Sequence, residues 1–196
     1  MRALIHQTPP ALRIGVLVTT AAAAIWFIAD HGATLNPAID HSTHNIVDFE
    51  LARTGERASA ILDEWGPTGR DAAMEAIAID FGLLVAYSIF LAFACGWVAE
   101  ALDRHRQRHI AGIGWWLTRL ALVAGLLDAI ENTALLGVLR QYESGNVHSG
   151  VTLLAAAAAS LKFIILIAVA GFLVVGLLTL IWHWLRSVRS VSGRSS

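Results

Sequence analysis

The sequence predicts an all-α integral membrane protein: a four-helix bundle with an additional amphipathic helix in a long first extracytoplasmic loop. Three observations predict this fold. Only 15% of the 196 residues are charged and 56% are hydrophobic, whereas a soluble domain usually carries about a quarter charged residues. The mean hydropathy is +0.61. Four runs approach or exceed the length of about 20 apolar residues that a helix needs to cross a bilayer. We treat residues 1–196 as a single membrane domain.

The predicted spans are residues 11–29, 77–99, 115–139 and 151–185. The first could instead be a secretory signal, because Arg2 and Arg13 precede an apolar core rich in alanine. That core continues into an apolar Ile-Trp-Phe-Ile stretch rather than a polar mature start, so we favour an uncleaved span. The short connections after the second and third spans favour antiparallel neighbours in a compact bundle.

The distribution of arginines predicts that both termini are cytoplasmic. One side of the predicted bundle carries eight of them and the other carries four, spread over a longer stretch; the eight are Arg2, Arg13, Arg104, Arg106, Arg108, Arg186, Arg189 and Arg194, and the four are Arg53, Arg57, Arg70 and Arg140. Short cytoplasmic loops are enriched in Lys and Arg. Five tryptophans fall near the same boundary, where amphipathic rings prefer to lie: Trp97, Trp115, Trp116, Trp182 and Trp184.

The segment 30–76 separates the first two spans and holds nine of the fifteen acidic residues. Its second half has helical periodicity, which predicts an amphipathic helix over about 45–65. The apolar positions are Val47, Leu51, Ala58, Ile61, Leu62 and Trp65. Asn45, with Asp48 three residues later, is a candidate N-cap. Gly66 and Pro67 should end the helix, and Thr68 is the expected cap of the next one.

The apolar stripe of this helix could lie on the lipid surface or on the bundle. Helices that bind membrane surfaces are usually rich in Lys and Arg, and this one is net acidic. We therefore favour a helix that packs on the bundle as a lid over its outer end. The remaining alternative is a connector that only shields the ends of the spans.

Carboxylates interrupt two of the apolar runs. Asp128, Glu131 and Asn132 fall within roughly 100° of arc on one helix face, and Asp80 and Tyr87, seven residues apart, share a face of the second span. At 1.5 Å per residue, the three acids lie about 20–25 Å from the cytoplasmic tryptophans. Matching depths on separate helices predict a shared polar pocket in the outer half of the bundle, because ionisable groups in a membrane need partners, water or a function.

Lys162 lies near the outer boundary of the fourth span, beside the alanine run 155–159. We favour pairing of its ammonium with the acidic cluster, because paired charges are less costly to bury. Extension of the side chain to the membrane surface is the alternative. The alanine run itself is expected to be a packing seam, because small residues let helices approach closely.

No residue pattern predicts a cofactor. His41 and His44 are weak candidates for a metal site, since no third ligand is evident. No histidine lies at mid-depth where it could hold a haem. The net charge of −1 argues against a nucleic-acid partner, and the single cysteine excludes an intrachain disulfide.

Three functions remain open. The ligand-binding candidates are Asp80, Tyr87, Asp128, Glu131, Asn132 and Lys162. They could bind or transfer a proton, a cation or an amphiphilic small molecule. They could instead serve a lipid-modifying enzyme as an acid–base pair, although no catalytic residue can be assigned. Lastly, they could be neutral carboxyls that only join helices, in an accessory or assembly subunit with a protein partner in the membrane.

Overall fold

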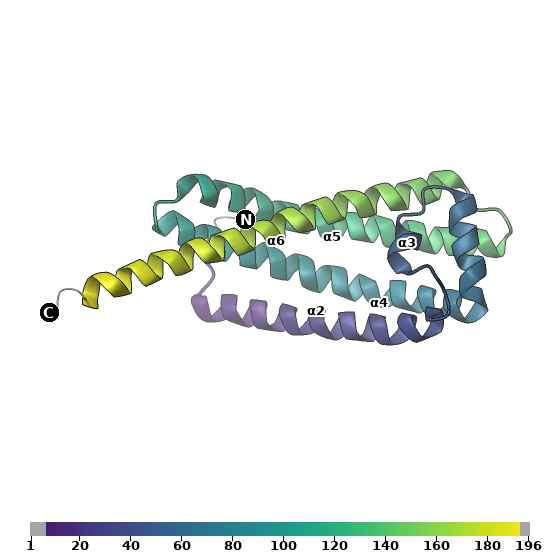
Figure 1. The fold of residues 1–196 in the computed structure, drawn as a ribbon, viewed down its shortest axis with the longest axis horizontal. Helices are drawn as coiled ribbons and strands as arrows, with labels where there is room; N and C mark the ends of the chain where they lie inside the picture. Colours follow the sequence, from purple (N-terminus) through teal and green to yellow (C-terminus); the bar gives the residue numbers. More distant parts are fainter. Residues whose placement is uncertain (1–6, 193–196) are drawn as a thin grey trace.

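The computed structural model describes residues 7–192, with side chains through Arg186 except that of Trp184. Arg2 and Arg194 therefore lie outside the described residues, as do the side chains of Arg189 and Trp184. Within this part the chain is all-α, without strands (Figure 1). Its helices are α2 (Pro10–Ile39), α3 (Ile46–Glu50), α4 (Gly55–Arg104), α5 (Arg108–Glu143) and α6 (Ser149–Ser192).

Four helices of the described chain are long and apolar enough to cross a membrane, which confirms the predicted bundle. They are α2, α4, α5 and the part of α6 that ends at His183. The helices extend past the predicted spans, because apolar runs report the hydrocarbon-crossing part and not the whole helix. For example, α2 continues beyond residue 29 through Ile39, and its last turns bury Leu35 and Ile39.

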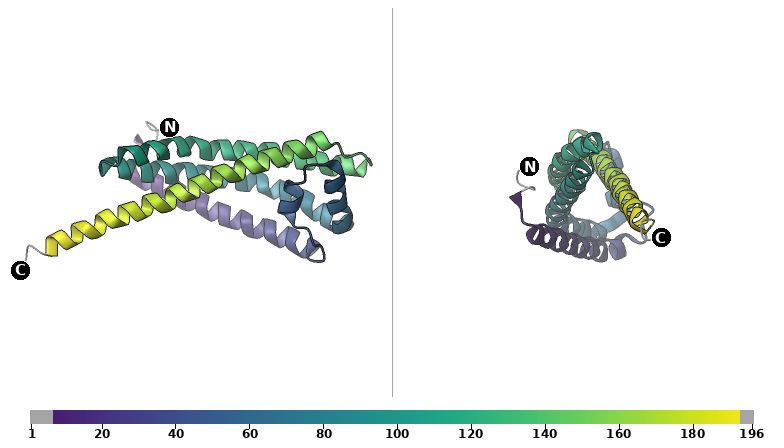
Figure 2. Two further views of the ribbon diagram at one scale, coloured as in Figure 1. Left: turned by 45° about the horizontal axis from the view of Figure 1, so that its top comes forward. Right: turned by 90° about the vertical axis from the view of Figure 1, so that its left-hand side faces the viewer.

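α4 lies at the centre of the arrangement. It packs along α2 on one side and along α5 and α6 on the other, and α5 packs along α6. Over the described residues, α2 and α6 make at most marginal contact with each other. Figure 2 shows the long helices along and across the bundle, with α3 at the end opposite the α4–α5 connection. We call the end that carries α3 the α3 end, and we call the end that carries the α4–α5 connection the loop end.

The buried apolar side chains form two separate cores. The core at the α3 end joins α2, α3, α4, α5 and α6 and contains Leu35, Phe49, Ile61, Leu62, Trp65, Ile77, Leu135, Val138 and Leu139. The core at the loop end joins α4, α5 and α6 and contains Ala92, Cys95, Leu102, Ala121, Ile165, Val169 and Phe172. Between them, α4, α5 and α6 carry a layer of polar side chains, which we call the polar layer.

The prediction of one continuous amphipathic helix over 45–65 is wrong. The structure has α3, a turn at 51–54, and then the first part of α4. Asn45 caps α3 as predicted: its Oδ1 accepts hydrogen bonds from the backbone N–H groups of Val47 at 2.8 Å and Asp48 at 3.2 Å. Thr54 then caps α4 by accepting from the N–H of Arg57 at 3.2 Å. This second cap explains the division, because Thr side chains readily start helices.

The predicted break at Gly66 is confirmed. Gly66 has φ 67° and ψ −176°, a conformation that only glycine adopts readily. The helix resumes at Pro67, so the prediction of a cap at Thr68 is wrong. Proline suits a first helical position because that position needs no N–H partner. Residues 55–65 consequently lie across the α3 end of the bundle (Figure 1), where Ile61, Leu62 and Trp65 join the core.

The close approach of α4 and α5 predicts a matched pair of glycine substitutions. A Cβ at Gly125 would lie 2.8 Å from Cβ of Ser88, whereas one at Gly112 would meet nothing within 4 Å. Gly125→Ala should therefore destabilise the bundle by about 1–3 kcal/mol through overpacking. Gly112→Ala, on the same helix, should be neutral or stabilising. Thermal unfolding in detergent compares the two, and equal melting temperatures would contradict the close packing.

Candidate functional site

The polar layer brings together the six side chains that the sequence singles out. α4 supplies Asp80 and Tyr87, α5 supplies Asp128, Glu131 and Asn132, and α6 supplies Lys162. Asp128, Glu131, Asn132 and Lys162 are buried. Helical spacing explains this convergence, because residues three, four or seven apart share one face. Whether the group binds a ligand stays a prediction.

Lys162 pairs with two acids, which confirms the favoured interpretation over extension to the membrane surface. Its Nζ lies 2.7 Å from Oδ1 of Asp128 and 2.6 Å from Oε2 of Glu131. Only 8% of the Lys162 side chain is exposed, so these contacts replace its hydration. The neighbouring alanines Ala155, Ala158 and Ala159 are buried.

Both carboxylate oxygens of Asp128 accept hydrogen bonds. Lys162 donates to Oδ1, and the Tyr87 hydroxyl donates to Oδ2 at 2.7 Å. The three side chains come from three different helices, so they link α4, α5 and α6 through one carboxylate.

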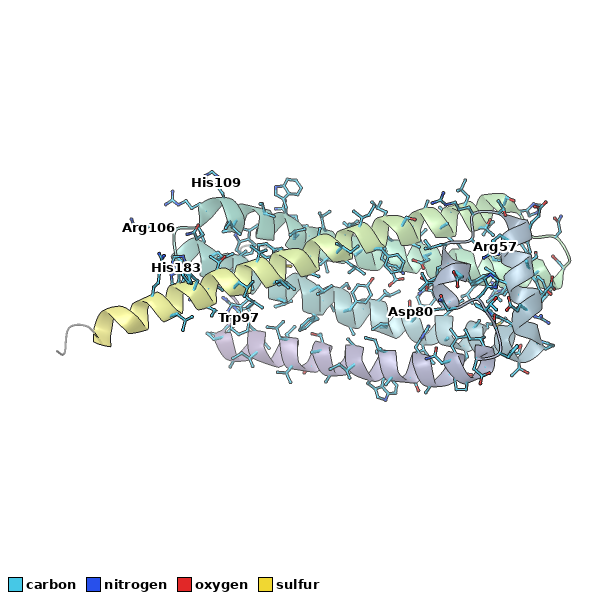
Figure 3. The ribbon with its side chains drawn as sticks, in the orientation of Figure 1. Arg57, Asp80, Trp97, Arg106, His109 and His183 are labelled. Carbon is cyan, nitrogen blue, oxygen red and sulfur yellow. The ribbon has the colours of Figure 1, made fainter. Side chains whose placement is uncertain are left out.

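Asp80 and Asn132 form a second link between α4 and α5. The amide nitrogen of Asn132 donates to Oδ2 of Asp80 at 2.7 Å. Asn132 is buried, whereas Asp80 is half-buried and lines a cavity. Figure 3 locates Asp80 on α4 toward the α3 end of the bundle.

Glu50 is a member of the site that the sequence analysis missed. This last residue of α3 is half-buried and lines the same cavity as Asp80 and Asp128. Glu50 follows Val47 by three residues and precedes Leu51. An acid at that position falls inside the apolar stripe rather than opposite it, and this spacing is the signal that could have found it.

The surroundings of Glu50 favour its neutral form. Burial raises the pKa of Glu50 from 4.5 to about 7, because a charge is less stable away from water. The Lys162 ammonium opposes this shift, and the carboxylates Asp128 and Asp80 reinforce it. The neutral form of Glu50 is therefore favoured more strongly than that of a glutamate in water.

A cavity of about 660 Å³ lies beside the polar layer. Its titratable lining residues are His31, Glu50, Asp80, Tyr87, Asp128 and Lys162, and its apolar lining residues are Ile28, Val47, Leu83, Phe90, Leu91, Phe163 and Leu166. They come from all five helices, and the fully buried Glu131 is not among them. Because α2 and α6 are not packed together, the cavity occupies the space between them.

The histidines proposed as weak metal ligands have other partners. His44 contacts the Glu64 carboxylate through Nδ1, and its Nε2 lies 2.7 Å from a guanidinium nitrogen of Arg57. His41 Nε2 lies 3.2 Å from the backbone oxygen of Glu64. These contacts fix residues 41–44 to the first part of α4. Among the described residues, no three His, Cys, Asp or Glu side chains are grouped to hold a metal ion.

The loop end carries a second buried ion pair that the sequence analysis did not predict. Arg13 of α2 contacts the Glu100 carboxylate of α4, and both side chains are 10% exposed. Arg104 lies 3.0 Å from the other oxygen of Glu100. This pair anchors the start of α2, far from the cavity.

No protein-family model matches the chain, and neither a curated protein nor a solved structure matches it. Any function must therefore be inferred from the polar layer and its cavity.

Proposed function

We propose that this protein binds, within a lipid bilayer, an amphiphile that has a cationic head. The observation that carries the proposal is that one cavity is lined by a group of acids and by apolar side chains, and that the apolar part of the lining is the larger. Pockets of this kind bind a molecule through a few convergent polar groups and a mostly apolar lining. The head would lie at the acids, and the tail would lie along the apolar side chains.

The charge of the lining favours a cation over an anion. Three carboxyl groups, those of Glu50, Asp80 and Asp128, face the cavity, against one ammonium group from Lys162. That ammonium is already paired with two acids. Asp80 accepts its one described hydrogen bond from a neutral amide, and among the described residues no cation forms an ion pair with it within 4 Å. A ligand ammonium would supply that missing charge at the base of the cavity.

The apolar part of the lining fits a hydrocarbon tail. Leu83, Phe90 and Leu91 on α4 face Leu166 on α6 across the cavity. The outward surface supports a lipid environment as well. Its large exposed apolar residues include Ile25, Trp26, Leu126, Ile164 and Ile167, each at least 60% exposed. Placement of the acids in the outer half of the membrane, with both termini cytoplasmic, is part of this proposal.

The test uses the purified full-length protein in nanodiscs of zwitterionic lipid. Octyltrimethylammonium is the probe, and octyl sulfate and octanol are its anionic and neutral counterparts. We expect measurable binding of the cation and at least about tenfold weaker binding of the other two, since a hydrogen bond or contact with a charged group contributes about 1.5–3 kcal/mol.

Asp80→Asn should weaken binding of the cationic probe by about tenfold or more, on the same energetic ground. Asp71→Asn is the matched control, because Asp71 is exposed near the α3 end and outside the cavity lining. Equal binding of octyl sulfate, or unchanged binding in a folded Asp80→Asn variant, would reject the proposal. Full cellular function of Asp80→Asn and Glu131→Gln would favour an assembly subunit instead.

A further inference from the structure

A second cavity, of about 580 Å³, lies at the α3 end of the bundle. Its lining comes from α4, the end of α5 and the connection between α5 and α6, and it shares no lining residue with the cavity beside the polar layer. The charged lining residues are Arg70, Asp71 and Glu143. Among the described residues, none of these three forms an ion pair. Both signs of charge therefore border one cavity, and neither is neutralised.

Arg70 is held in place by groups that do not neutralise it. One of its guanidinium nitrogens donates to the backbone oxygen of Leu62 at 2.9 Å, and its Cζ lies 5.0 Å from the centre of the Tyr142 ring. The Tyr142 hydroxyl in turn donates to the Asp63 carboxylate, which orients the ring. A guanidinium has five N–H donors, so most of them stay available. A half-buried guanidinium that is positioned in this way suits the paired oxygens of a phosphate group.

The two acids decide which phosphate could bind here. Asp71 and Glu143 are exposed and border the same cavity, so they would repel a simple anion such as inorganic phosphate. A ligand that carries an ammonium beside its phosphate would be attracted by both parts of the lining. The half-buried Ser59, whose hydroxyl has no described hydrogen bond, adds a neutral donor to this lining. The charge pattern is therefore complementary to a zwitterion rather than to an anion.

The position of the cavity points to a lipid headgroup. Met74 and Tyr142, both in its lining, each lie three residues outside the predicted membrane spans, and three residues rise about 4.5 Å along a helix. The headgroup layer is about 5–8 Å thick on each side of the hydrocarbon core. The cavity is therefore expected at headgroup depth, whichever side of the membrane the α3 end faces.

We propose that this second cavity binds the headgroup of a zwitterionic phospholipid, with the phosphodiester at Arg70 and the ammonium at Asp71 and Glu143. The site is independent of the proposed function, because it lies in a different cavity and takes a different ligand. Octyltrimethylammonium lacks the phosphate that Arg70 would bind, and in nanodiscs of zwitterionic lipid the second cavity would already hold a headgroup. Soluble glycerophosphoethanolamine carries the same two charged groups, so the test includes it as the other source of this chemistry.

The experiment titrates the purified full-length protein, in dodecyl maltoside, with dioleoylphosphatidylethanolamine and with dioleoylphosphatidylglycerol, and native mass spectrometry counts the bound lipids. The two lipids share their tails and their phosphodiester, and only the ethanolamine lipid has an ammonium. Arg70→Gln should raise the dissociation constant of the ethanolamine lipid about tenfold or more, because a charged hydrogen-bond partner is lost. Arg140→Gln is the matched control and should not change it, because Arg140 is exposed on α5 and outside the cavity lining.

Glu143→Gln tests the part of the site that would bind the ammonium. It should weaken binding of the ethanolamine lipid about twofold to fivefold, the range expected for an exposed pair of opposite charges. Binding of the glycerol lipid should not weaken, because that lipid has no positive charge. Glu143 is exposed at the end of α5, so this variant keeps the test decisive even if Arg70→Gln does not fold.

The outcomes separate this site from the first cavity. Unchanged binding of the ethanolamine lipid in a folded Arg70→Gln protein, or an unchanged preference between the two lipids in Glu143→Gln, would overturn the proposed site. Loss of lipid binding in Asp80→Asn but not in Arg70→Gln would place the lipid beside the polar layer and overturn it as well. Binding of glycerophosphoethanolamine as tight as that of the lipid would overturn the membrane as the source of the ligand. Absence of octyltrimethylammonium binding would reject only the proposed function.

Discussion

Lys162→Met should destabilise the bundle by about 3–5 kcal/mol, the cost typical of breaking a buried ion pair from one side. The substitution keeps the length of the side chain but removes the only described cation within 4 Å of Asp128 and Glu131. Both acids are nearly or fully buried, so little water can reach them to replace the lost ammonium. Thermal unfolding in detergent, followed by circular dichroism, measures the effect.

Two variants make this prediction specific. Arg119→Met is the control for loss of a positive charge, because Arg119 is exposed and lies over the Trp116 ring at 5.6 Å; it should change stability by less than about 0.5 kcal/mol. Adding Asp128→Asn and Glu131→Gln to Lys162→Met should restore part of the loss, because the two acids that lost their ammonium partner would then be neutral. A Lys162→Met protein as stable as Arg119→Met would contradict the ion-pair interpretation.

Trp65→Ala should produce the second large effect. It should lower the free energy of unfolding by about 3–5 kcal/mol, and the destabilisation should be concentrated at the α3 end. Trp65 is 1% exposed, its ring centroid lies 5.2 Å from that of Phe49, and its indole N–H donates to the backbone oxygen of His44 at 2.9 Å. These contacts hold α3 against α4. Without them, α3 and the residues before it should exchange their amide hydrogens faster, while the loop end should not change.

Trp26→Ala is the matched control for this substitution. Trp26 is 60% exposed on α2, so its removal creates no cavity and should leave exchange at the α3 end unchanged. Uniform acceleration of exchange over all the helices would show instead that Trp65 stabilises the whole bundle rather than its α3 end.

The fold class could be predicted because the signals behind it are long and local. Apolar runs of spanning length cannot be hidden in a small soluble domain, and short connections leave few arrangements for four helices. The helix boundaries were predicted less well. Leu35 and Ile39 are buried by the folded α3 end, and nothing in a hydropathy pattern reports a contact between residues so far apart in the chain.

The side chains of the polar layer could be grouped from depth and helical face alone, because α4, α5 and α6 are regular helices in which each residue has a predictable height. Glu50 could not be grouped with them by the same method. Its position depends on the turn at 51–54 and on the break at Gly66, which fold the first part of α4 across the bundle. Such changes of chain direction are set by tertiary packing, so an acid outside the predicted spans can lie beside a buried acid of a span.

The way in which α2 is attached has a consequence for selectivity. Its buried side chains lie near its two ends, Arg13 at one and Leu35 and Ile39 at the other, while Ile28 and His31 border the cavity. Between these ends α2 also packs along α4, where the Phe27 ring lies against Gly82, so the α2 wall of the cavity is held along its length. A fixed wall on α2 would limit the girth of a head that enters beside α6, so discrimination among ligands would depend on their shape as well as on their charge.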